Sequence, residues 1–136
     1  MRTIVFDTPR IGQWVCERTG GAFNGEGAAI GLEQGGELIA GVLYDQYNGR
    51  SACMHVAAAK GASWMTRPYL RICFDYPFNQ LKLNTLIGLV DSTNEDALRF
   101  DKHLGFRLAT VIPGAGQKGD LCILTMARNQ CRFLKD

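Results

Sequence analysis

Residues 94–107 read N-E-D-A-L-R-F-D-K-H-L-G-F-R, and they follow an apolar run, L-N-T-L-I-G-L-V, at residues 83–90. The apolar run is typical of a buried strand. Asn94 is of a residue type that caps helices, and it predicts a helix at residues 95–104. That helix then ends in a Leu-Gly-Phe turn. The stretch therefore predicts a strand, a capping asparagine, a short helix and a tight turn, in that order.

Hydrophobic periodicity and turn residues predict the other elements. Strands are expected at residues 3–6, 28–34, 37–47, 51–58, 83–90, 106–112 and 120–127. Helices are expected at residues 11–18, 64–81 and 95–104. Gly35-Gly36 and Asn48-Gly49 predict two hairpin turns of the same kind. Pro9 is expected to separate the first strand from the first helix, and Pro77 to kink or end the second helix near Tyr76.

The resulting order is β-α-β-β-β-α-β-α-β-β. Strands on both sides of single helices predict a mixed sheet with helices on its faces, an α/β fold of the α+β mixed-sheet type. A chain of 136 residues is long enough to bury one core. With no repeat and no linker, residues 1–136 are expected to form a single domain.

Composition and charge exclude several classes of protein. The net charge is +2, and the 15 Lys and Arg residues are scattered, which argues against nucleic-acid binding. No apolar run is long enough to span a bilayer, and the first residues do not form a signal peptide, so a cytoplasmic protein is expected. Five cysteines without C-x-x-C spacing argue against a disulfide framework and against a metal site.

The element order and the Asn94 segment resemble the GCN5-related N-acetyltransferase (GNAT) superfamily. In that family an asparagine opens a helix that ends in a Lys-Leu-Gly-Phe-like turn. The resemblance covers nearly the whole chain in architecture, but only residues 56–107 in motif. It implies the acyl-CoA N-acyltransferase fold and an enzyme that moves an acetyl group from acetyl-CoA to a primary amine by direct attack in a ternary complex. Residues 68–81, P-Y-L-R-I-C-F-D-Y-P-F-N-Q-L, look most like the ribosomal-protein alanine N-acetyltransferase branch and its short bacterial and phage relatives.

The resemblance also implies where acetyl-CoA binds. The strand at residues 51–58 should splay away from the strand at 83–90, so that the pantetheine arm adds to backbone groups near Met54 and Val56. The family's phosphate loop, Q/R-x-x-G-x-G/A, matches G-A-S-W-M-T at residues 61–66. In this loop Gly61 replaces Gln or Arg, Trp64 replaces the first glycine, and Thr66 replaces the second small residue. The implied cofactor-binding residues are Met54, Val56, Lys60, Gly61, Ala62, Ser63, Trp64, Thr66, Arg67, Asn94, Arg99 and Lys102.

Acetyl transfer also needs a base for the amine and an acid for the leaving thiolate. His55 on the splayed strand is the candidate base, with a purely structural histidine as the alternative. The family's usual acid is a tyrosine, and here Asp101 holds that position. An aspartate can donate a proton only if burial raises its pKa. Ser92 or Thr93, at the end of the preceding strand, is the candidate substitute.

Two alternatives stay open from the sequence. The chain is either an acetyltransferase or a catalytically degenerate member of the fold that binds or regulates. The acceptor would be a protein N-terminus, a lysine or a small molecule, and no residue distinguishes them. Phe133 and Leu134 near the C-terminus are expected to pack on the domain or on a second copy, which would make a homodimer.

Overall fold

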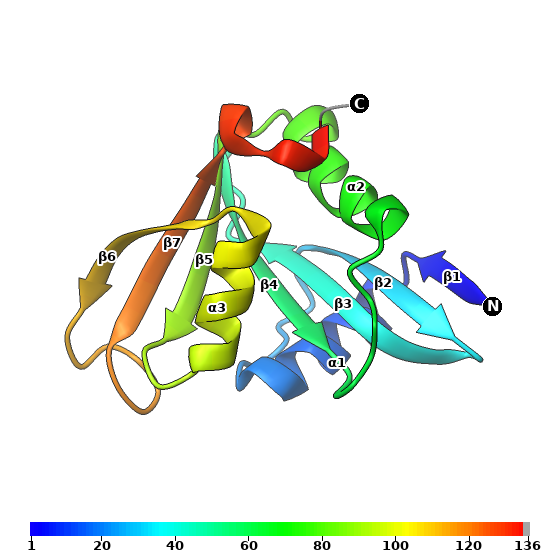
Figure 1. Ribbon diagram of the computed structural model, residues 1–136, viewed down its shortest axis with the longest axis horizontal. Coiled ribbons are helices and arrows are strands. Elements are labelled where there is room, and N and C mark those ends of the chain that lie inside the picture. Colours follow the sequence, from blue (N-terminus) through cyan, green and yellow to red (C-terminus); the bar gives the residue numbers. More distant parts are fainter. Residues whose placement is uncertain (135–136) are drawn as a thin grey trace.

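The computed structural model describes residues 1–134. Seven strands form one mixed sheet in the order β1-β2-β3-β4-β5-β7-β6 (Figure 1). The order of strands and helices along the chain is the predicted one. The strands are β1 (Arg2–Val5), β2 (Ala28–Gln34), β3 (Glu37–Asp45), β4 (Ser51–Ala58), β5 (Thr85–Asp91), β6 (Arg107–Ile112) and β7 (Leu121–Ala127).

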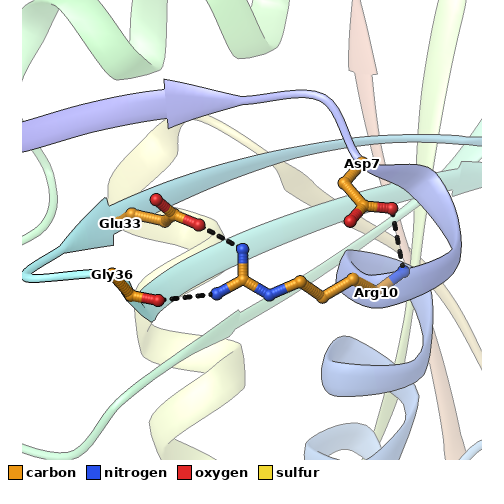
Figure 2. A network of polar contacts seen from close by, with 4 residues as sticks. All are labelled: Asp7, Arg10, Glu33 and Gly36. Carbon is orange, nitrogen blue, oxygen red and sulfur yellow. Dashed lines mark hydrogen bonds and ion pairs between the residues drawn. The ribbon is translucent and has the colours of Figure 1, made fainter.

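The first helix, α1 (Thr8–Thr19), begins three residues earlier than the sequence predicts. Pro9 lies in its first turn, where a missing N–H costs nothing, and so it starts the helix instead of breaking the chain. The Asp7 side chain caps the helix by accepting from the Arg10 amide. The Arg10 guanidinium pairs with Glu33 and donates to the Gly36 carbonyl, which ties α1 to the β2–β3 hairpin (Figure 2).

The second helix is shorter than predicted. The structure has α2 at Arg67–Asp75, followed by a π-helical turn at Tyr76–Gln80. Pro77 lies in this wider turn, so the chain continues past it without an α-helical hydrogen bond at that position. Trp64 is outside the helix, in the loop that follows β4. Phe133 stacks on Phe74 of α2, with ring centroids 4.9 Å apart, so the tail packs on its own domain.

The third helix, α3 (Glu95–Leu104), has the predicted boundaries. The Asn94 side chain accepts from the Ala97 amide at 3.1 Å and caps the helix, as the sequence indicates. Gly105 ends it in the left-handed conformation that favours glycine.

The helices divide between the two faces of the sheet. Helix α1 packs on β2, β3 and β4, where Ile11 and Val15 meet Leu43 and Ala57. Helices α2 and α3 pack on the opposite face, over the larger core that includes Leu86 and Leu124. No helix within residues 1–134 is both long and apolar enough to cross a membrane. All five cysteines are buried and free.

The central pair of strands is joined over a short length only. β4 and β5 run parallel, and three residue pairs connect them, from Ser51↔Thr85 to Cys53↔Ile87. Beyond Cys53 the two strands diverge, and Figure 1 shows them side by side at one end and separated at the other, with α3 in front of the opening. This is the splay predicted for residues 51–58 and 83–90. It positions the candidate site.

Candidate active site

The gap between β4 and β5 exposes backbone groups of β4. From Met54 onward, β4 is paired with β3 on one side and with no strand on the other. Unpaired N–H and C=O groups along an open strand edge can bind an extended ligand that carries amides of its own. Met54 is buried in the core, and Val56 packs against it. The open edge therefore allows the predicted backbone contacts of Met54 and Val56 with such a ligand, and their role stays a prediction.

His55 lies on the α1 face, just past the last residue pair that joins β4 to β5. Its Nε2 atom is 2.8 Å from Oδ1 of Asp45 on β3. Both side chains are 24% exposed, so the pair is accessible to a small ligand. A carboxylate that accepts from one ring nitrogen fixes the orientation of the imidazole and leaves the other nitrogen to accept a proton. The pair can therefore act as an oriented general base.

Asp101 lies on the opposite face of the sheet. It is only 8% exposed, and a Cβ atom placed on Gly88 of β5 would be 3.1 Å from its Oδ2. Gly88 follows Ile87, the last β5 residue that pairs with β4. Burial raises the pKa of the Asp101 carboxyl from 3.8 to about 7. No residue among those the structure describes forms a hydrogen bond or ion pair with the carboxylate. Asp101 therefore keeps a proton in a pH range where an ordinary aspartate has lost it.

Trp64, which the resemblance aligns with the family's first loop glycine, lies in the loop between β4 and α2. The residue is 8% exposed, and its ring packs edge-on against Phe100 of α3, with centroids 4.9 Å apart. The loop after β4 is thereby held against α3. The first turn of α2 supplies few amides, because Pro68 has none and the Leu70 amide donates to the Thr66 carbonyl. The Thr66 side chain makes no capping bond.

The other predicted loop residues lie in the segment that joins β4 to this helix. Gly61 has a φ of +78°, a conformation that favours glycine, in a turn where the Ala62 amide donates to the Ala59 carbonyl. Lys60 and Arg67 are exposed. The Ser63 carbonyl accepts from the Arg2 side chain. The segment can offer charges and hydroxyls to an anion, but few free amides.

The residues predicted beyond β5 lie past the end of that strand or on α3, and not at the point where β4 and β5 separate. Ser92 lies at the end of β5, and its Oγ accepts from the Asp120 amide. The neighbouring Asp91 carboxylate accepts from the amides of Thr93, Lys118 and Gly119, and these bonds hold its pKa far below the usual value. Lys102 is exposed, and Arg99 pairs with Asp96 on the surface of α3. These side chains do not join the His55 and Asp101 groups.

Two segments meet near the wide end of the gap on the α1 face. Gln117, in the loop between β6 and β7, donates from Nε2 to the Gly20 carbonyl at 2.8 Å. Gly20 ends α1 in the left-handed conformation. The segment that ends α1 and the loop between β6 and β7 are therefore in direct contact.

The sequence did not single out Asp45 from the other acids on the hairpin. The sequence does indicate that Asp101 is buried. Asp101 follows Ala97 by four residues and precedes Leu104 by three, a spacing that places all three on one face of a helix. Leu104 is buried and Ala97 packs against the core, so the same face carries Asp101 inward.

Comparisons with known proteins find similar folds but no matching sequence family. No protein-family model matches the chain, and no curated protein matches its sequence. A spermidine/spermine N-acetyltransferase of Vibrio cholerae, solved as glutamate-to-glutamine mutant forms, is 15% identical, with a TM-score of 0.70 over 95% of this chain and 96% of that one. The fold is that of the GCN5-related N-acetyltransferases.

Two further solved structures agree with this GNAT fold. A chimera of the Vibrio cholerae spermidine N-acetyltransferase with hSSAT is 20% identical, with a TM-score of 0.66 over 83% of this chain and 71% of that one. The Campylobacter jejuni N-acetyltransferase PseH, in complex with acetyl coenzyme A, is 17% identical, with a TM-score of 0.59 over 77% and 70%. The predicted fold class is confirmed. The assignment of site residues and the nearer branch stay predictions.

Proposed function

We propose that this GNAT-fold protein is an acetyl-CoA-dependent N-acetyltransferase that acts on a primary amine. One observation carries the proposal: an oriented histidine and a protonatable carboxyl lie on opposite faces of the sheet, at the point where β4 and β5 separate. A reaction that removes a proton from one partner and returns one to the other needs such a pair. The buried Asp101 favours turnover over the alternative of a degenerate binding protein.

The residues of the gap fit the acyl donor. The open edge of β4 would accept the amides of the pantetheine arm, and its direction leads from the Trp64 loop to the point of separation. Acetyl-CoA supplies an acetyl group activated as a thioester. The phosphate loop fits less well, because Trp64 and Pro68 remove close backbone approach and one amide. Positive side chains, beginning with Arg67, would have to replace those amides.

Side-chain and backbone groups of this site then have separate roles in the reaction. His55, oriented by Asp45, takes a proton from the ammonium form of the acceptor, so that the neutral amine attacks the thioester carbon. A free amide of β4 donates to the carbonyl oxygen as negative charge develops there. The C–N bond forms, the nitrogen releases its second proton to solvent, the C–S bond breaks, and Asp101 gives its proton to the departing sulfur. We assign the acid role to Asp101 in preference to Ser92, because Asp101 is beside Gly88 at the gap.

The proposal is tested first by the binding of acetyl-CoA and then by turnover with candidate acceptors. Saturating acetyl-CoA is expected to raise the melting temperature, because a ligand that binds only the native state stabilises it. Thiol release is then measured with spermidine, a peptide with an N-terminal alanine and a lysine peptide as separate acceptors. Spermidine is included because the Vibrio cholerae neighbours are named for it. The absence of any shift with acetyl-CoA or CoA would contradict the proposed function.

Replacing His55 with glutamine is expected to lower kcat/KM for an alkylamine by about 10²–10⁴-fold at pH 7, because the general base is lost. Asp45→Asn should cause a smaller loss, since the histidine remains but loses its orientation. The measurement is kcat/KM for wild type and variants with two acceptors. A hydroxylamine-type acceptor, already neutral at pH 7, should react almost equally with both proteins. Equal losses with both acceptors would make His55 structural.

Trp64 should report on the cofactor directly. In a Trp14→Phe variant Trp64 is the remaining tryptophan, and its ring packs against Phe100. A ligand arm that enters the gap passes this ring contact, so titration with acetyl-CoA is expected to shift the emission maximum of Trp64 and change its intensity. A Trp64→Phe variant that keeps Trp14 serves as the control and should show little change. An unchanged Trp64 signal at saturation would place the ligand elsewhere.

A further inference from the structure

One half of the sheet has no helix on one of its two faces. Helix α1 packs on β2, β3 and β4, whereas α2 and α3 pack on the opposite face. Within residues 1–134, no helix therefore packs on the α1 face of β5, β7 and β6, and Figure 1 shows α3 on the other side of these strands. We call this surface the uncovered face. It adjoins the reaction site, because β5 forms the far side of the gap from His55.

The uncovered face is mainly apolar. In β5, Leu86 points into the core under α2 and α3, so the residues that alternate with it point to the uncovered face. One of them, Leu89, pairs with Ile123 of β7, which pairs in turn with Thr110 of β6. Leu89 is 41% exposed although β5 is an internal strand of the sheet. The apolar residues of the uncovered face are Ile87, Leu89, Ile112, Leu121 and Ile123.

Leu89 lies across the gap from the candidate base. Cys53 and Ile87 are the last residues of β4 and β5 that pair with each other. His55 and Leu89 each lie two residues farther along these strands. Because side chains alternate along a strand, both point to the same face of the sheet. An amine that gives its proton to His55 would therefore have an apolar surface on its β5 side, beginning at Leu89.

The charges on the uncovered face do not suit a polycation. Among the described residues of β5, β6 and β7, this face carries two charged side chains, Asp91 and Arg107. The Asp91 carboxylate accepts from three backbone amides and from the Thr93 hydroxyl, so its acceptor positions are occupied. Arg107 is exposed and positive. A second ammonium group on the acceptor would meet a positive charge and no free carboxylate on these strands.

We propose that the acceptor is a primary amine attached to an apolar chain or ring, and that Leu89 selects such an acceptor over a polyamine. The apolar part would lie along Leu89 and Ile123 while its amine reaches His55. The proposal rests on the acetyltransferase function proposed above and narrows the acceptor of that same site. It sets this chain apart from the Vibrio cholerae neighbours, which are named for spermidine.

Hexylamine and hexane-1,6-diamine test the proposal, because they share a six-carbon chain and differ by one ammonium group. Per amino group, wild type is expected to have a kcat/KM about tenfold higher for hexylamine, the effect of about two more buried methylene groups. Leu89→Asp should reverse this preference, because a carboxylate there would pair with the second ammonium. The readout is the ratio of the two kcat/KM values, since an effect of the new charge on His55 applies to both acceptors.

Leu108→Asp is the matched control for the introduced charge. Leu108 pairs with the buried Leu124, so it lies on the opposite face of the sheet, and it is 48% exposed. Its kcat/KM ratio should equal that of wild type. Leu89→Ala removes apolar contact without adding charge, and it should raise KM for hexylamine about threefold while KM for the diamine stays nearly unchanged. Melting curves establish that all three variants fold.

The outcomes separate the acceptor proposal from the acetyltransferase function. If wild type acetylates both amines equally, or prefers the diamine, the acceptor proposal is wrong and the acetyltransferase function stands. If wild type releases no thiol, the binding of both amines is measured by saturation-transfer NMR with CoA present. A preference for hexylamine that Leu89→Asp removes would then support the acceptor surface while the proposed chemistry fails. Equal binding of the two amines, or none, would overturn the acceptor proposal.

Sedimentation of wild type and Leu89→Asp tests the other possible occupant of the uncovered face, a second copy of the chain. Both proteins are expected to have the same oligomeric state, because Leu89 is assigned to the substrate. A wild-type dimer that Leu89→Asp separates into monomers would show that the uncovered face is buried between two copies. That result would contradict the proposal.

Discussion

Replacing Asp101 with asparagine is expected to lower kcat by about 10²–10⁴-fold, the usual contribution of a general acid, with little change in acetyl-CoA affinity. Asparagine keeps the size and shape of the side chain but cannot give a proton to the departing sulfur. In the wild type, burial raises the pKa of Asp101 to about 7, so the protonated form is lost as the pH rises through that value. Turnover by the wild type should therefore fall above about pH 7, and the variant should lack that decline.

The leaving group provides the decisive comparison. S-acetylpantetheine releases an alkylthiolate, which needs a proton, whereas phenyl thioacetate releases a much less basic arylthiolate. Neither donor carries the nucleotide, so the comparison isolates the step at sulfur. The Asp101→Asn defect is expected to be large with the first donor and small with the second. An equal defect with both donors would show that Asp101 shapes the site without acting as an acid.

The same substitution is expected to change how stability depends on pH. The pKa of Asp101 is 3.8 in an ordinary environment and about 7 in the native protein, so the native state binds the proton more tightly than the unfolded chain. Between about pH 4 and 7 the native state holds more protons, and the free energy of unfolding must fall as the pH rises. The full difference corresponds to about 4 kcal/mol, because one pKa unit is about 1.4 kcal/mol.

Urea unfolding from pH 4 to pH 8 measures this effect. The free energy of unfolding of Asp101→Asn, relative to wild type, should increase by about 4 kcal/mol across the range, because asparagine has no charge to bury. Asp96→Asn on the same helix is the matched control, since the Asp96 side chain is 92% exposed, and its difference from wild type should stay nearly flat. Parallel curves for Asp101→Asn and wild type would mean that the carboxyl is not protonated in the native state.

Local signals were enough to predict the order of the elements. Residues 95–104 carry a capping asparagine at one end and a glycine at the other, and both act on adjacent backbone. The Gly35-Gly36 turn likewise fixed its hairpin, in which Gln34 pairs with Glu37. The wider π turn at Tyr76–Gln80 was not predicted, because Pro77 gives the same signal whether a helix ends or widens.

The His55–Asp45 pair could not be predicted, because it depends on the length of the loop between β3 and β4. A two-residue turn at Asn48-Gly49 would pair Tyr47 with Arg50 and put Asp45 and His55 on opposite faces of the sheet. The structure instead joins β3 to β4 through residues 46–50 and pairs Asp45 with Cys53. The Asn48 side chain accepts from the amides of Arg50 and Ser51 and stabilises this longer loop. The register moves by one residue, and both side chains reach the α1 face.

The short junction of β4 and β5 also has a consequence for the unliganded protein. A row of unpaired amides and carbonyls is a template for strands of other molecules, and natural sheets usually cover such rows. Here the row lies inside the sheet, and α3, whose Phe100 contacts Trp64, lies in front of the gap (Figure 1). By holding the loop after β4 against α3, those two rings would help to keep foreign strands out of the gap. Solubility and ligand entry would depend on the same pair of side chains.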